Sequence, residues 1–175
     1  MSNRKGYDAL AVANWFLDRA ASDPDHNGVD HLKLQKLIYI AHGWDLATSG
    51  APLIFQDVQA WPYGPVIPAV YHEFKHCGKL PIADRATVYT HDGERVPAGA
   101  EFDTATLAVL NRVWDSYKEY SGIDLTGMTH STGTPWRNIS DGKSKDDYAG
   151  TNIPNDGIKQ YYVSLGKQNR AKNAG

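Results

Sequence analysis

The segment "VDHLKLQKLIYIAHGWDLATSG" (Val29–Gly50) carries the strongest local signal in this chain and predicts a helix. Asp30 is a suitable N-cap residue, and Gly50 is a suitable stop two residues before Pro52. Apolar residues recur along one helical face, namely Leu34, Leu37, Ile38, Ala41 and Trp44. The segment is therefore expected to contribute one apolar face to the core.

Further helices follow from the same kind of evidence. In "YDALAVANWFLDRAA" the apolar residues repeat at helical spacing until "SDPD" interrupts them. In "DTATLAVLNRVWDSYKEYSG" Asp103 is the expected N-cap and Gly122 the expected stop. The chain is thus predicted to form helices over residues 7–21, from 65 or 68 to 77, between 103 and 122, over 123–131 and over 154–165.

Strand signals are fewer. "LIFQDVQAW" (Leu53–Trp61) alternates partly, and "TVYTHDGERV" (Thr87–Val96) joins two short runs through Asp92-Gly93, a pair that favours a tight hairpin turn. Residues 140–157 are polar and rich in glycine, which predicts a surface loop, and residues 166–175 are expected to form a flexible tail. The expected fold is a compact single domain over residues 1–175, mainly α with a small β element (α+β), whose core spans about 7–165.

Composition excludes several classes of protein. The 175 residues carry a formal net charge of −2, without the basic excess that nucleic-acid binding requires, so no nucleic-acid partner is expected. The single Cys77 excludes an intramolecular disulfide framework. The sequence has no apolar run of about 20 residues and no signal peptide, so we expect a cytoplasmic protein without a membrane span.

The stretch "HEFKH" (His72–His76) matches H-E-x-x-H, in which two histidines hold zinc and the glutamate activates water. A zinc-dependent hydrolase is therefore the alternative function. Such a site needs a third protein ligand, and the candidates Glu94 and Glu101 lie beside a predicted turn and before an N-cap. Gly78 also ends the helix almost at once. We favour a solvated helix face, and we expect no metal, no cofactor and no catalytic residue.

The stretch "AWPYGPVIPAVYHEFKHCG" places large aromatic residues around three prolines and a glycine. Trp61, Tyr63, Tyr71 and Phe74 would cluster at a rigid turn that enters a helix. Such a cluster forms either a corner of the core or a rigid recognition surface, because pre-ordered aromatic residues lose little entropy on binding. The residues alone leave these two interpretations open.

Three motifs together resemble those of the Panacea domain family, the SocA-like or GepA-like phage-associated family. They are "LKLQKL" on the helix described first, "WPYGPV" before a Y-x-x-F-K-x-x-G helix, and "THSTGTPWR" near residue 130. The resemblance covers roughly residues 7–165. It implies an antitoxin that neutralises a cognate protein toxin by direct contact, with delivery of the toxin to a protease in some members. It implies no enzyme activity.

The resemblance also suggests which residues contact the partner. The first motif supplies Gln35 and Tyr39, the second Trp61, Tyr63, Gly64, Pro65 and Tyr71, and the third His130, Trp136 and Arg137. Each has a structural alternative: the tryptophans can pack in the core, Gly64 and Pro65 can shape a turn, and His130 is more readily a structural histidine. Among the aromatics, we expect Tyr63 to be an interface residue and Trp61 a core residue.

Overall fold

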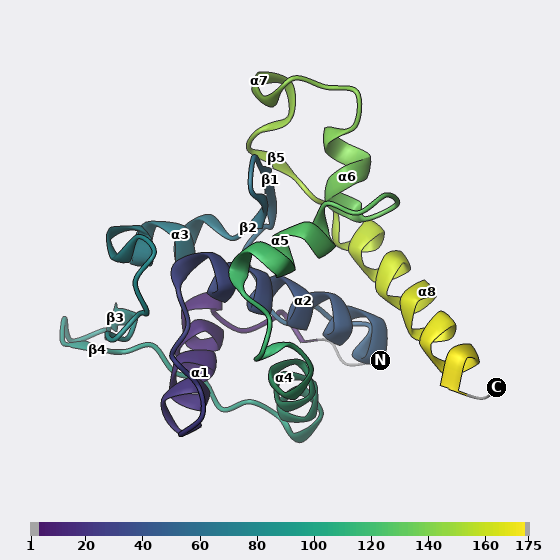
Figure 1. The fold of residues 1–175 in the computed structure, drawn as a ribbon. Coiled ribbons are helices and arrows are strands. Elements are labelled where there is room, and N and C mark those ends of the chain that lie inside the picture. The colour runs from purple at the N-terminus through teal and green to yellow at the C-terminus, as the bar shows by residue number, and fades with distance from the viewer. Residues whose placement is uncertain (1–3, 174–175) are drawn as a thin grey trace.

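The computed structural model describes residues 4–173 of the chain, which fold around the helix α2 (His31–Ser49). Asp30 caps α2 by accepting a hydrogen bond from the Lys33 amide (2.8 Å), and Gly50 ends it with a φ of +76°. Helices α1, α3, α4, α5 and α8 all pack against α2 (Figure 1). Instead of the expected single apolar face, α2 is therefore buried on nearly all sides, and even Lys36 has no exposed surface.

The described residues form eight α-helices, and the predicted fold class is confirmed. Besides α2 these are α1 (Ala9–Ala21), α3 (Pro68–Phe74), α4 (Thr104–Tyr117), α5 (Gly122–Thr129), α6 (Pro135–Ser140), α7 (Lys145–Tyr148) and α8 (Asn155–Asn173). A short 3₁₀ helix, η1 (Lys75–Cys77), continues α3. None of the helices in residues 4–173 is long and apolar enough to cross a membrane.

Two small antiparallel sheets complete the fold. One has the strand order β2-β1-β5 and is formed by β1 (Gln59–Trp61), β2 (Gly64–Val66) and β5 (Thr151–Asn152). The other is the predicted hairpin of β3 (Thr87–Tyr89) and β4 (Arg95–Pro97), with Gly93 at a φ of +80° in its turn. The expected strand over residues 53–61 is regular only in its last three residues.

Two segments have more regular structure than predicted, although most of their residues are exposed. Residues 140–157 contain α7 and β5, and the side chains of Tyr148 and Ile153 are buried in the core. These two apolar residues are five positions apart, a spacing that matches neither the helix nor the strand period, so they gave no periodic signal. The predicted tail is helical as far as residue 173, because α8 continues to Asn173. Residues 174 and 175 lie outside the described part of the chain.

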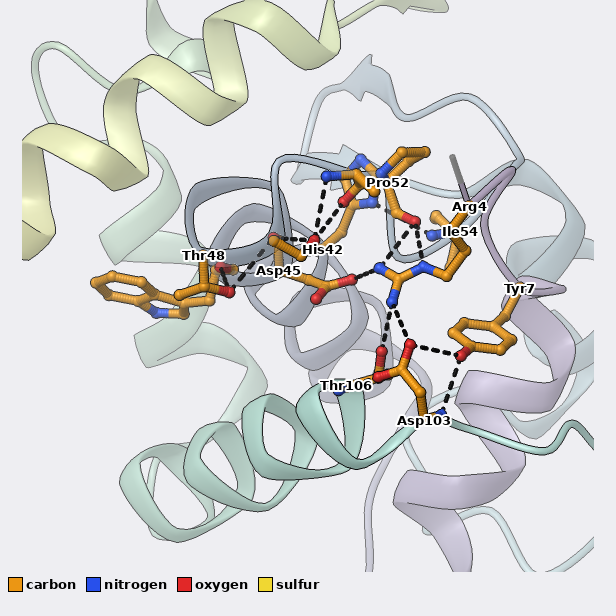
Figure 2. Close-up of polar contacts among 12 residues, drawn as sticks. Arg4, Tyr7, His42, Asp45, Thr48, Pro52, Ile54, Asp103 and Thr106 are labelled. Carbon is orange, nitrogen blue, oxygen red and sulfur yellow. Dashed lines mark hydrogen bonds and ion pairs between the residues drawn. The ribbon is translucent and has the colours of Figure 1, made fainter. Parts of the chain in front are cut away.

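Arg4 ties the start of the chain to the centre of the fold, as Figure 2 shows. Its guanidinium pairs with the buried carboxylate of Asp45 on α2 and donates to the carbonyl oxygen of Pro52 (3.2 Å). It also donates to Thr106 Oγ1 (2.6 Å) and to Asp103 Oδ2 (3.1 Å) at the start of α4. Burial raises the pKa of Asp45, and the Arg4 charge opposes this rise. The cluster joins α2 to α4, and we interpret its role as structural.

Helix α8 is attached to α2 at two adjacent positions. The His42 ring accepts from the Ile54 amide at Nδ1 (3.4 Å), so its Nε2 donates to Asn155 Oδ1 (2.8 Å) at the first residue of α8. The ring of Tyr162 lies directly on the backbone of Gly43, where a Cβ atom would be 2.2 Å from the ring. Beyond Gly166 the described residues of α8 are all exposed, and the helix extends past the body of the domain (Figure 1).

Candidate partner-binding site

The three sequence motifs, which lie far apart in the chain, meet at one place in the fold. The indole Nε1 of Trp136 at the start of α6 donates to the carbonyl oxygen of Trp61 on β1 (2.9 Å). From α2, the Nζ atom of Lys36 donates to the carbonyl oxygen of Pro65 on β2 (3.0 Å). The turn between β1 and β2 is therefore held from both sides by side chains of the other two motifs.

The residues of the first motif lie inside this site. Gln35 is 1% exposed and bonds both backbone groups of Ile67, donating to the carbonyl oxygen (3.3 Å) and accepting from the amide (2.9 Å). Tyr39 is 2% exposed, and its hydroxyl has no hydrogen-bond partner among residues 4–173. Because its side chain is buried, Gln35 can affect partner binding only by fixing the position of the Ile67 backbone.

The glycine of the second motif is required by both its backbone and its neighbours. Gly64 has a φ of +100°, in the region that side-chain-bearing residues avoid. A Cβ atom there would lie 2.8 Å from Thr129 Oγ1 and 3.0 Å from Lys36 Nζ. Gly64 and Pro65 are both buried, so they shape the turn and do not present side chains at the surface.

The third motif forms a stacked pair. The His130 ring lies parallel to the Trp136 ring, with 3.7 Å between centroids, and the Trp136 side chain is buried. His130 Nε2 has no hydrogen-bond partner among residues 4–173, and burial lowers the pKa of this ring, as do the charges of Lys36 and Arg137. Arg137 is exposed and pairs with Asp141 (3.4 Å) one helical turn later.

Aromatic rings reach the surface on the opposite side of the turn. The Tyr71 ring on α3 lies 4.7 Å from the Trp61 ring, 5.1 Å from His31 and 5.5 Å from His72, centroid to centroid. Trp61, Tyr71 and His31 are half-buried. Tyr63, at the tip of the β1–β2 turn, is 73% exposed. We call Trp61, Tyr63, Tyr71, His31 and His72 the aromatic surface.

Lys36 is the residue of this site that the sequence analysis missed. Its amine has no exposed surface, and burial lowers its pKa from 10.5 to about 7. Lys36 also lowers the pKa of His31 and of His130, after the larger effect of burial on each ring. A signal was present, because Lys36 lies inside the "LKLQKL" motif, but periodicity assigns a lysine in an amphipathic helix to the solvent face.

The "HEFKH" residues do not share one α-helical face. Helix α3 ends at Phe74, so His72 is helical, whereas His76 lies in η1. Both histidines are exposed. Within residues 4–173 no group of three or more His, Cys, Asp or Glu side chains is arranged to hold a metal ion. In the described part of the chain, no third side chain therefore joins these two histidines in a metal-binding arrangement.

Comparisons with known proteins match this chain over the same motifs. The family model "Antitoxin SocA-like, Panacea domain" matches residues 34–137, a range that contains the second and third motifs and all but the first two residues of the first. The chain is also 33% identical, over 156 residues, to a protein described as "Antitoxin SocA" from Caulobacter vibrioides (strain NA1000 / CB15N), covering 89% of this chain and 82% of that protein. No solved structure is a significant match.

Proposed function

This chain belongs to the antitoxin SocA-like Panacea domain family, and on that premise we propose that it neutralises a cognate protein toxin by direct binding in the cytoplasm. Binding, and not catalysis, is the proposed mode of action. Lys36, the amine in this site whose pKa is lowered to about 7, has no surface that a substrate could reach. The partner is a protein, and neither a nucleic acid nor a cofactor is part of the proposal.

We place the toxin contact on the aromatic surface. The observation that carries this choice is the 73% exposure of Tyr63 on a turn whose backbone is held by Lys36 and, through Trp61, by Trp136. A rigid turn loses little conformational entropy on binding, and tyrosine and tryptophan are common anchors of interfaces. In this assignment Tyr63 contacts the toxin directly, whereas Gln35, Gly64, Pro65 and Trp136 hold the turn in shape.

A second step of the proposal is delivery of the bound toxin to a protease. The exposed end of α8, residues 170–173, could contact a protease without disturbing the core. Removal of residues 170–175 should then leave the thermal unfolding midpoint and toxin binding unchanged but prolong the lifetime of the toxin in cells. If the lifetime does not change, α8 has no part in delivery.

The experiment that tests neutralisation is co-expression with the product of the adjoining reading frame. The intact chain should restore growth to cells that express this product, and Tyr63→Ala should restore it poorly while unfolding at the same temperature as the intact chain. Tyr89→Ala is the matched control, because Tyr89 is 75% exposed on the separate β3–β4 hairpin. If Tyr63→Ala and Tyr89→Ala rescue equally well, the toxin does not bind at the turn.

A further inference from the structure

Two surface cavities lie along α8 and meet at Tyr161 and Leu165, which line both. The first, of about 410 Å³, is bounded by α2, the end of α4, the end of α5 and α8. The second, of about 640 Å³, lies between α6 and α8. The loop between α5 and α6, residues 131–134, lines both cavities. We call the two cavities together the α8 groove. Two adjoining cavities suit a chain segment better than a small molecule, because a small molecule occupies one pocket.

The α8 groove differs from the rest of the molecule in charge. Among the described residues that line it there is no Asp, Glu, Lys, Arg or His, although 22% of the chain is Asp, Glu, Lys or Arg. The first cavity contains five tyrosines, Tyr39, Tyr117, Tyr120, Tyr161 and Tyr162. Interface cores are depleted of charged residues and enriched in tyrosine, so this lining favours an uncharged occupant.

Two further observations point to a peptide. Tyr39 lines the first cavity, and its buried hydroxyl has no hydrogen-bond partner among residues 4–173, so a backbone carbonyl oxygen of a peptide could pair with it once the adjacent lining side chains move aside. At the edge of the same cavity, Met128 and Tyr120 are 37% and 42% exposed, and both residue types are enriched at protein interfaces.

The α8 groove also adjoins the motif site. Thr129 at the end of α5 lines the groove, while its Oγ1 atom packs against Gly64 in the β1–β2 turn. We infer that the α8 groove binds an uncharged, apolar segment of the cognate toxin, in addition to the contact at the aromatic surface. This inference rests on the proposed function, since the occupant is a part of the toxin. A single toxin could then contact both sides of α5.

The test places a negative charge in the groove without touching the core. Ser131→Glu and Gln168→Glu introduce charges at exposed positions that line the first and second cavities. Ala171→Glu is the matched control, because Ala171 is exposed on α8 and lines neither cavity. Calorimetric titration of the full chain with the purified product of the adjoining reading frame should show binding weakened at least tenfold by each groove variant and less than twofold by Ala171→Glu. All three variants should keep the unfolding midpoint of the intact chain.

The outcomes separate this inference from the proposed function. If the intact chain binds and neutralises the toxin and both groove variants do so equally well, the groove inference is wrong and the proposed function stands. If the intact chain does not bind, both are wrong. Sedimentation of the free chain as a dimer that Ser131→Glu dissociates would assign the groove to a second copy of this chain, and so would also overturn the inference.

Discussion

The indole nitrogen of Trp136 is hydrogen-bonded to the backbone carbonyl of Trp61, 75 positions earlier, at 2.9 Å. This bond joins α6 to the strand that leads into the β1–β2 turn. The same indole stacks on His130, so one side chain holds together the second and third motifs. The shape and stability of the β1–β2 turn depend on this arrangement and on Lys36, which donates to the Pro65 carbonyl oxygen.

Trp136→Phe should destabilise the fold by about 1–2 kcal/mol, because phenylalanine keeps a ring against His130 but cannot donate to the Trp61 carbonyl. The free energy of unfolding in urea measures this change. Trp61→Phe is the control, since the half-buried Trp61 indole donates only to the Gln59 side chain, an acceptor that water can satisfy. Equal losses of unfolding free energy in the two variants would show that the hydrogen bond of Trp136 contributes no more to stability than that of Trp61.

Gly43→Ala should weaken the attachment of α8. A Cβ atom at Gly43 would lie 2.2 Å from the Tyr162 ring, and this ring is buried against α2, so it would have to shift. We expect lower unfolding free energy and faster amide hydrogen exchange in α8 than in α1. Gly127→Ala is the control, because a Cβ atom there meets open space on α5, and alanine should stabilise this helix slightly. Unchanged exchange in α8 would contradict the prediction.

Lys36→Met should remove part of the pH dependence of stability. The pKa of Lys36 is about 7 in the fold and 10.5 in an unperturbed chain, so between these values the unfolded state binds more protons. Stability of the intact chain should therefore rise from pH 7 to pH 10, by an amount on the order of a few kcal/mol. Methionine has nearly the same volume and does not titrate.

Urea unfolding at several pH values between 7 and 10 measures this slope. Lys75→Met, at an exposed position, should retain the slope of the intact chain. A Lys36→Met profile parallel to that of the intact chain would mean that Lys36 keeps an ordinary pKa in the fold.

The double variant His72→Ala/His76→Ala should change the unfolding free energy by no more than about 0.5 kcal/mol, because both side chains are exposed. The single variant His76→Ala, which lies outside the aromatic surface, should rescue cells from the toxin as well as the intact chain does. Elemental analysis should find no stoichiometric zinc. About one zinc per chain, lost in the double variant, would support the hydrolase alternative.

Local sequence signals predicted the elements whose formation depends on neighbours a few residues away. Asp30 and Gly50 mark the ends of α2 because a cap bonds the first turn and a glycine adopts the positive φ of the stop. The hairpin at Asp92-Gly93 formed as expected for the same reason, since its turn needs a positive φ at Gly93. The motif residues that surround the β1–β2 turn were also named in advance, from their resemblance to a family.

Burial was decided only by the tertiary structure. Nothing within a few residues of Lys36 or Gln35 shows that they lie inside the fold; α3, α5 and α8, packed around α2, exclude water from them. The regular structure within residues 140–157 was missed because short-range periodicity does not record long-range packing, such as that of Tyr148 against Trp136. Sequence alone therefore determined where α2 begins and ends, whereas contacts between distant segments determined which of its side chains are buried and which surface remains for a partner.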